Sequence, residues 1–406
     1  MKYVCSGNGK LPLVTLIAIL SVSLTVNLPG LAISPIMGKL KDVFPHASQL
    51  QIQMLSVMPN LIIIPFILFS GKLATRRNQS WVLSAGLALF AASGILYFFA
   101  DSMTSLIVIS CLLGVGCGLV IPIAAGLIAE HFSGEPKRTA LGMESGVSNG
   151  MVILATLFVG WMADFGWHAC FAVYLIPVIP LALMPYMSNR FIGRHAVAAA
   201  PSESAAPAQP VPVGKRPIGR LLGLIGLYIG LTYGVIVFSY YLPFTMKHYG
   251  LPTHAVGVAS AMFYLTATLG GFLLPYYLRV FRRLSPYLAL AVSAAGVFML
   301  GFVHTYAFYI IGVLLIGFGY GIVQPIIYNK TSDLSTDKAR STRNFSYVLI
   351  GNYIAIAVAP FIVEFFEYLF NDHSVDFPYL LNGTVLVILL VTGIIWRRSY
   401  VWRVKG

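Results

Sequence analysis

Residues 114–122 read Gly-Val-Gly-Cys-Gly-Leu-Val-Ile-Pro, and residues 317–325 read Gly-Phe-Gly-Tyr-Gly-Ile-Val-Gln-Pro. Three glycines and a proline recur at a constant offset of 203 residues, half the length of the 406-residue chain. The same offset places Asn149 on Asn352. A motif that recurs at half the chain length predicts two homologous halves, and a chance match between glycine-rich apolar segments is the alternative.

The sequence on both sides of these motifs is strongly apolar. Hydrophobic residues make up 58% of the chain and charged residues only 10%, whereas about a quarter of a soluble protein is charged. A helix needs about 20 mostly apolar residues to cross a bilayer. Eleven runs free of Asp, Glu, Lys and Arg qualify: 11–38, 43–71, 78–100, 102–129, 145–163, 165–189, 221–246, 248–278, 284–329, 344–363 and 377–396. The composition therefore predicts an integral membrane protein.

The ninth run is 46 residues long, too long for one crossing, and it is interrupted near Val303-His304-Thr305-Tyr306. Divided there, the runs predict twelve transmembrane helices. Helices are favoured over barrel strands because the runs are continuous and do not alternate. The predicted fold class is all-α integral membrane, with twelve transmembrane helices in two six-helix bundles.

The basic residues predict the orientation of these helices. Of the 26 Lys and Arg residues, only Lys39, Lys41 and Lys247 fall on the side opposite the two termini, so 23 share the side of the termini. The positive-inside rule places that side in the cytoplasm. The net charge of +13 is thereby explained without a nucleic-acid partner. The first run has 28 residues, more than a signal-peptide core, and is expected to be a retained helix of a cytoplasmic-membrane protein.

A change of composition separates the two halves. Residues 196–214 are rich in Pro, Ala and Ser and carry one charge, so they cannot bury a core. We expect an N-terminal six-helix bundle at 1–189, a cytoplasmic linker at 190–217 and a C-terminal bundle at 218–406. Repeated six-helix units are typical of secondary transporters, in which substrate binds between the repeats and is exposed to each side in turn.

Three segments carry a resemblance to a known family. They are the loop Gly71-Lys-Leu-Ala-Thr-Arg76-Arg77, the pair Gly114-x-Gly116, and Phe165-Gly-Trp-His-Ala-Cys-Phe171. Each resembles a motif of the major facilitator superfamily of secondary transporters, and the resemblance covers essentially the whole chain. It implies alternating access, a gating-loop role for Gly71, Arg76 and Arg77, and a monomer.

Other positions depart from the patterns of the family's branches. Thr75 stands where an aspartate is usual, and Ser110 where proton-coupled members commonly have an arginine. Residues 155–160 keep only Gly160 of the Gly-Pro signature typical of drug/proton antiporters. The chain is loosely similar to both the drug/proton antiporter and the small-solute permease branches, and the departures weigh against the former.

Glu144 is the acid that lies deepest in a predicted helix. Charged groups in a bilayer are costly and usually functional, so its carboxylate is the candidate proton-coupling group. The alternative is a glutamate near the cytoplasmic N-terminus of its helix, favoured by the helix dipole and paired with a loop arginine.

Uncharged polar side chains inside the apolar runs are the candidate substrate-binding residues. The set comprises Asn27, Asn60, Asn149, Tyr233, Tyr264, Gln324, Asn352 and Tyr353. A buried amide needs hydrogen-bond partners, which a wet cavity supplies, and tyrosine offers a ring plus a hydroxyl to an amphipathic ligand. The alternatives are hydrogen bonds between helices for the amides and packing for the tyrosines. Other tyrosines, such as Tyr228, are interpreted as belt residues at the membrane interface.

No Lys or Arg lies near the middle of a run, which disfavours a strongly anionic substrate. The sequence predicts a transporter for a small neutral, weakly charged or amphipathic organic solute, with efflux of hydrophobic compounds as the alternative. The coupling ion is left open, with H+ as the candidate. No cofactor or metal is expected, and the expected partners are the solute and the bilayer. A membrane enzyme is the remote alternative, since its best cluster, Asp372-His-Ser-Val-Asp376, has no convincing metal spacing or nucleophile elbow.

Overall fold

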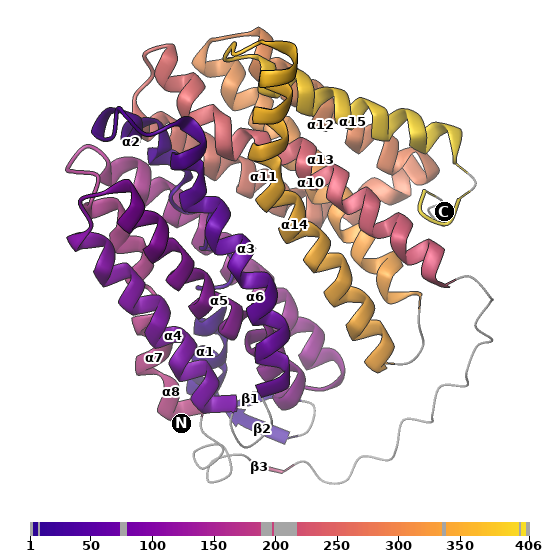
Figure 1. Cartoon of the computed structure of the whole chain (residues 1–406). Coiled ribbons are helices and arrows are strands. Elements are labelled where there is room, and N and C mark those ends of the chain that lie inside the picture. Colours follow the sequence, from indigo (N-terminus) through magenta and orange to yellow (C-terminus); the bar gives the residue numbers. More distant parts are fainter. Residues whose placement is uncertain are drawn as a thin grey trace. The chain divides into compact units, whose positions relative to one another are not determined.

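The computed structural model describes residues 3–6, 9–73, 79–187, 197–198, 217–334, 338–397 and 399–402. The chain forms two compact units, whose helices and strands are labelled in Figure 1. Unit 1 comprises Met1–Ile33 and Met54–Pro207, and unit 2 comprises Ser34–Gln53 and Ala208–Gly406.

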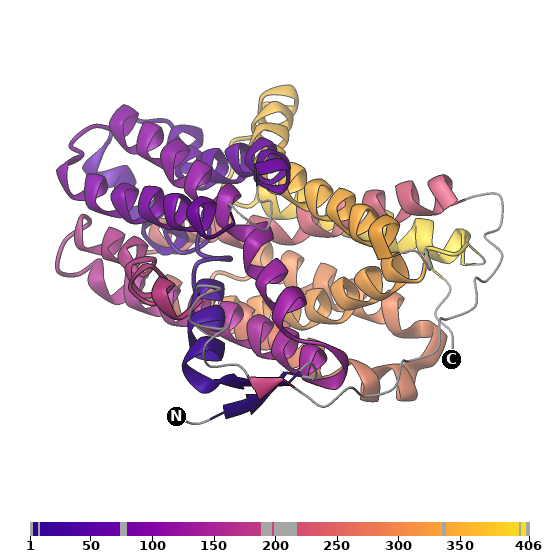
Figure 2. The same ribbon diagram turned by 90° about the horizontal axis from the view of Figure 1, so that it is seen from below.

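Unit 1 is built mainly from helices. The longer ones are α1 (Leu13–Ser23), α3 (Gln49–Leu73, of which the first five residues belong to unit 2), α4 (Gln79–Leu96), α5 (Met103–His131) and α6 (Gly134–Met162). The shorter ones are η2 (Tyr97–Phe99), η3 (Ala169–Leu175), α7 (Val178–Ala182) and α8 (Met184–Met187). Three short antiparallel strands, β1 (Tyr3–Cys5), β2 (Gly9–Pro12) and β3 (Val197–Ala198), form a small sheet in that order beside the start of α1 (Figure 2).

Unit 2 contains the longest helices of the chain. They are α10 (Pro217–His248), α11 (Thr253–Phe281), α12 (Ser285–Phe302), α13 (Tyr306–Ser332), α14 (Lys338–Phe370) and α15 (Phe377–Ile395), with the 3-10 turn η4 (Arg282–Leu284) before α12. The 3-10 turn η1 (Ser34–Ile36) and α2 (Met37–Val43) also belong to this unit. The whole stretch Ser34–Gln53 belongs to unit 2, and at its end Gln53 Nε2, in α3, donates a hydrogen bond to the Tyr240 carbonyl of α10 at 3.2 Å.

The prediction of one continuous helix over 11–38 is wrong. Helix α1 ends at Ser23, turns follow, and the chain resumes as η1 and α2. Pro29 lacks a backbone N–H, and Gly30 has a φ of +73°, a conformation that side chains with a Cβ rarely adopt. These two residues explain why an apolar run of sufficient length does not form one helix.

The run 165–189 is also not one helix. It forms η3, α7 and α8 in succession. Prolines at 177, 180 and 185 fall at the junctions or inside the short helices, and each removes a backbone donor and crowds the preceding turn. A run free of charge therefore does not by itself establish a single crossing helix.

The predicted division of the run 284–329 is confirmed. Helix α12 ends at Phe302 and α13 begins at Tyr306, with Val303 extended at the C-terminus of α12. Within the described residues, nine stretches are long and apolar enough to cross a membrane, and one of these, Thr253–Phe302, covers both α11 and α12. The fold is thus helical and rich in candidate membrane spans, while the count of twelve crossings in a 6+6 arrangement stays a prediction.

The repeated glycines sit at close helix contacts in both units. In unit 1, a Cβ on Gly114 would lie 2.7 Å from the Pro59 carbonyl of α3, and one on Gly116 would lie 2.8 Å from the Gly86 carbonyl of α4. In unit 2, a Cβ on Gly317 or Gly319 would collide with backbone of α11 or α12, respectively. In unit 1 the motif helix α5 packs against α3 and α4, and in unit 2 the motif helix α13 packs against α11 and α12. In both units the motif helix thus packs against the two long helices that precede it, as two homologous halves predict.

The predicted boundaries 1–189, 190–217 and 218–406 remain a prediction. The two compact units differ from the predicted halves in one respect, since Ser34–Gln53 groups with the C-terminal helices. Residues 190–196 and 199–216 of the predicted linker lie outside the described part of the chain.

Candidate functional site

Two of the predicted asparagines meet in unit 1. Asn27 follows α1, and its Nδ2 donates a hydrogen bond to Oδ1 of Asn149 in α6 at 3.3 Å. Both side chains are half-buried. The contact links the segment after the first helix of unit 1 to the candidate span Thr139–Met162.

The repeat-related asparagine in unit 2 has a matching contact. Thr232 Oγ1, on α10, donates to Oδ1 of Asn352 on α14 at 2.7 Å. Asn352, like Asn149, is half-buried. In each unit the carbonyl oxygen of the asparagine is held by a polar side chain on or just after that unit's first long helix. For neither asparagine does the described part of the chain supply a hydrogen-bond partner to Nδ2.

Gln324 is the centre of a cluster of tyrosine hydroxyls in unit 2. Its Nε2 lies 2.8 Å from the hydroxyl of Tyr228, 3.0 Å from that of Tyr328 and 3.2 Å from that of Tyr320. The hydroxyls of Tyr228 and Tyr328 lie 2.8 Å apart. The cluster joins α10 to α13 and presents amide and hydroxyl groups without a charge.

The sequence interpretation of Tyr228 is wrong, and Tyr328 was missed. Tyr228 is fully buried and is hydrogen-bonded inside the unit, so it is not a belt residue. A signal for Tyr328 was present in the sequence, because Tyr320, Gln324 and Tyr328 are spaced four residues apart. Residues at that spacing lie on one face of a helix.

The remaining polar candidates do not share one contact network. Asn60 is buried in α3, and its Nδ2 donates to the Ser56 carbonyl at 2.6 Å. Tyr233 is buried on α10, and its hydroxyl has no hydrogen-bond partner among the described residues. The ring of Tyr264 packs against Phe263 with 5.1 Å between centroids, and Tyr353 is half-buried next to Asn352. The Asn60 bond lies within α3, so it is not the hydrogen bond between helices that the alternative predicts, whereas the packing of Tyr264 fits the alternative for the tyrosines.

Glu144 lies ten residues after the start of α6 at Gly134 and is half-buried. The helix dipole acts within the first turn, so this position excludes the dipole part of the predicted alternative and leaves the pairing with a loop arginine untested. No ion pair to its carboxylate is found among the described side chains, which exclude Arg138. Ser148 donates a hydrogen bond to the backbone carbonyl of Glu144, not to its carboxylate.

The gating-loop residues fall mostly outside the described structure. Gly71 belongs to the last turn of α3, but the contacts around it are not among those that the structure describes. Arg76 and Arg77 lie in 74–78, outside the described residues.

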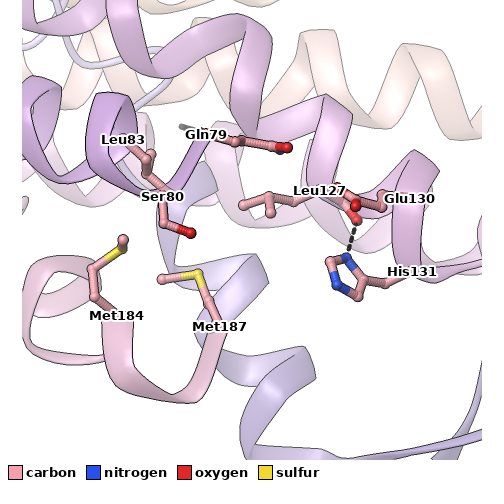
Figure 3. A pocket seen from close by; sticks show the side chains of 8 residues that line it. All are labelled: Gln79, Ser80, Leu83, Leu127, Glu130, His131, Met184 and Met187. Carbon is pink, nitrogen blue, oxygen red and sulfur yellow. Dashed lines mark hydrogen bonds between the residues drawn. The ribbon is translucent and has the colours of Figure 1, made fainter. Parts of the chain in front are cut away.

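Two cavities in unit 1 lie apart from the predicted polar residues. The larger, of about 270 Å³, is lined by Val4, Cys5, Leu16, Phe132, Pro136, Thr139, Ala140 and Met143. The smaller, of about 10 Å³, lies where α4, α5 and the α8 region meet, and Figure 3 shows its lining. There, His131 Nδ1 donates to the Leu127 carbonyl at 2.9 Å, so this histidine helps to close its own helix (Figure 3). Neither cavity contains the asparagines or Gln324.

These features define a helical membrane protein with an internally repeated packing motif. The sequence matches the model of the Major Facilitator Superfamily over residues 14–360, and again over residues 233–400. The chain belongs to this superfamily and is a multi-pass membrane protein of a transporter family, not an enzyme.

Curated relatives are similar to parts of the chain. The niacin transporter NiaP of Acinetobacter baylyi is 27% identical over 30% of this chain and 30% of its own length. The multidrug transporter MdtP of Bacillus subtilis is 28% identical over 31% of this chain and 23% of its own. A probable 4-methylmuconolactone transporter of Cupriavidus pinatubonensis is 29% identical over 43% of this chain and 41% of its own. The matches thus span less than half the length of each relative.

Solved structures resemble the chain over nearly its full length. The nucleoside transporter NupG, crystallised as a point mutant, superposes with a TM-score of 0.72 at 9% identity, covering 94% of this chain and 99% of the other. At this identity the similarity concerns the fold alone.

Proposed function

We propose that this protein is a secondary transporter that moves a small neutral, weakly charged or amphipathic organic solute across the cytoplasmic membrane by alternating access. It is proposed to act as a monomer, without a cofactor. Both termini are proposed to lie in the cytoplasm, as the distribution of basic residues favours.

The repeat-related asparagines carry this proposal. Asn149 and Asn352 each lie in a candidate membrane span, and each has its carbonyl oxygen engaged within its own unit. Polar groups away from water need partners, so an amide N–H₂ without a partner among the described residues suits a solute acceptor such as a carbonyl or carboxyl oxygen. An amide donor does not require a charged ligand, which agrees with the absence of basic residues from the middle of the apolar runs.

The tyrosine cluster supports the amphipathic character of the solute. Tyr320, Tyr328 and Gln324 are half-buried and offer aromatic faces next to hydroxyl and amide groups. Ligand sites typically combine aromatic side chains with a few polar groups that fix orientation. The named substrates of two relatives, niacin and 4-methylmuconolactone, are small organic compounds, and this is consistent with the proposed class.

A ligand screen with purified protein tests the proposal. A panel of small organic acids, lactones, nucleosides, phosphate esters and hydrophobic drugs is compared by thermal stabilisation, because a ligand that binds only the folded state raises its apparent stability. The expected hit is a neutral or weakly charged solute. For it, Asn352→Ala should weaken affinity by about 5- to 15-fold, the value of one to two hydrogen bonds.

Asn329→Ala is the matched control, because Asn329 is exposed on α13. An affinity unchanged in both Asn352→Ala and Asn149→Ala would contradict a binding role for the pair. Stabilisation by phosphate esters alone would contradict the proposed substrate class.

Proton coupling through Glu144 is the second part of the proposal. Its carboxylate is half-buried inside a candidate span and has no basic partner among the described side chains. An unpaired acid in a membrane span is expected to take up a proton when it loses contact with water.

Efflux of hydrophobic compounds is the alternative function. The similarity to a multidrug transporter of Bacillus subtilis favours it, whereas the missing Gly-Pro signature at residues 155–160 does not. The same ligand panel separates the two functions. A specific solute transporter responds to one chemical series, and a multidrug antiporter responds to several unrelated hydrophobic cations or neutral drugs.

A further inference from the structure

Among the described residues, a histidine–aspartate pair joins two loops in each unit. In unit 1, His168 Nε2 lies 3.6 Å from Asp101 Oδ1, linking the α6–η3 loop to the η2–α5 loop. In unit 2, His304 Nε2 lies 3.6 Å from Asp376 Oδ1, linking the α12–α13 loop to the α14–α15 loop. In the predicted topology all four loops face the outside.

The two pairs are related by the repeat, with acid and base exchanged. The 203-residue offset of the glycine motifs places Asp101 on His304. His168 and Asp376 lie in the corresponding loops, each just before the last helical region of its predicted half. The same pair of loops is therefore bridged in both units, although the residue types have changed places. A bridge at the same pair of loops in both units argues that the bridges have a role.

In each pair, one member depends on the other for a polar contact. His168 Nε2 and Asp376 Oδ1 are buried atoms without a hydrogen-bond partner among the described residues. A buried polar atom left unpaired is destabilising, and its nearest oppositely charged group is the other member of the pair. The side chains of His304 and Asp376 are 25% and 33% exposed, so this pair is also partly shielded from screening by water.

The groups around His304 hold its ring in place. The ring of Tyr249, in the α10–α11 loop, stacks on it with 4.1 Å between centroids, and His248 precedes Tyr249. His304 Nδ1 lies 3.2 Å from the hydroxyl of Tyr309 on α13. Among the described residues, Tyr379 on α15 also interacts with Tyr309 and Asp376 of this cluster. Asp376 is the carboxylate of the set, so it supplies the negative charge.

The groups around His168 are fewer. Trp167 stacks on its ring with 3.5 Å between centroids. Asp101 is the carboxylate within ion-pair distance, and its side chain is 91% exposed. Asp164 is a second acid of the α6–η3 loop. This pair is therefore more open to solvent than the pair in unit 2, and we expect it to contribute less.

We propose that the two pairs are proton-sensitive loop clasps, which hold the outer loops of each unit together when the histidine is protonated and loosen when it is neutral. Histidine is the side chain whose charge ordinarily changes between about pH 5 and 8. On the predicted outer face, the acidity of the external medium would then set the stiffness of these loops. This inference is independent of the proposed solute and of Glu144.

A double-mutant cycle on the full-length protein tests the clasp in unit 2. His304→Gln, Asp376→Asn and the double variant are compared by thermal unfolding at about pH 5.5 and about pH 8. We expect non-additivity of about 1–3 °C in the unfolding midpoint at the lower pH, and less at the higher pH, as for a partly exposed ion pair. His373→Gln, an exposed histidine in the same loop, is the matched control and should show no such coupling to Asp376→Asn.

A variant in which the two residues are exchanged provides a more specific test. Because unit 1 carries the pair in the opposite order, His304→Asp combined with Asp376→His should restore the pH-dependent coupling. Coupling of equal size at both pH values, or none at either, would overturn the proposal.

If a variant does not fold, the proposal is tested by measuring hydrogen exchange of the unaltered protein at the same two pH values. After correction for the intrinsic pH dependence, the segments 303–305 and 371–376 should be about 1.5- to 5-fold more protected at the lower pH. Equal protection at both values would also overturn the proposal.

Discussion

At the scale of single residues, Glu144 is the group on which the proposed energy coupling depends. Its position ten residues into α6 removes the helix dipole as the reason for its presence. An acid in a candidate membrane span without that support agrees with the proposed coupling role.

We predict that Glu144→Gln uncouples transport from the proton gradient. In proteoliposomes with an imposed pH gradient, accumulation of the identified solute should fall to the level measured without a gradient, while solute exchange at equal pH is retained. The amide keeps the size of the side chain but cannot take up or release a proton. Glu130→Gln, an exposed acid at the end of α5, should leave accumulation intact. Gradient-driven accumulation that survives in Glu144→Gln would refute the coupling role.

At the scale of helices, the glycine motifs set the distances at which helices pack. Gly319 of α13 faces the backbone of Ala289 and the side chain of Ser293 on α12. Because the backbone carbonyl cannot move away without moving the helix, there is no space for a methyl group.

Gly319→Ala should therefore destabilise the protein by about 1–3 kcal/mol, the usual cost of overpacking. Gly226→Ala is the matched control, since a Cβ at Gly226 on α10 would meet nothing within 4 Å. Because alanine has a higher helix propensity than glycine, this substitution should leave stability unchanged or raise it by up to about 1 kcal/mol. Thermal or denaturant unfolding in detergent measures both, and equal effects of the two substitutions would argue against close packing as the role of the motif.

Prolines explain which apolar runs fail to form single helices. Pro29 with Gly30, and the three prolines in 165–189, divide two runs whose composition alone predicted crossings. Pro122 and Pro325 lie inside long helices that continue past them. The position of a proline is visible in the sequence, but neighbouring helices decide whether the chain continues through it.

At the scale of the whole molecule, orientation is the prediction that is simplest to test. Cys5 is exposed on β1, Cys111 is half-buried, and Cys117 and Cys170 are buried. A membrane-impermeant maleimide should label Cys5 only in permeabilised cells or inside-out vesicles, because the N-terminus is predicted to be cytoplasmic. Cys5→Ser should abolish the signal. Labelling of Cys5 in intact cells would reverse the predicted orientation.

The repeat was visible in the sequence, whereas the contacts made by its residues were not. The offset alone paired Asn149 with Asn352, and hydropathy alone located most of the helices. The hydrogen bonds to Asn27 and Thr232 could not be predicted, because they join residues about 120 positions apart in the chain. Tyr228 was misassigned for the same reason, since its partners on α13 are brought to it only by packing.

The sequence by itself determined the membrane environment, the helical class and the two-fold repetition of the chain. Hydropathy, charge placement and glycine spacing are local properties of the sequence. In a bilayer an apolar segment forms a helix because its backbone polar groups must be hydrogen-bonded within the protein. Only the tertiary structure decided which polar groups are satisfied within the protein and which are left for other partners. The structure shows that the histidine–aspartate pairs meet within each unit, and that the amide nitrogens of the two asparagines have no partner among the described residues. Their chemistry depends on neighbours from distant segments, and packing alone selects those neighbours.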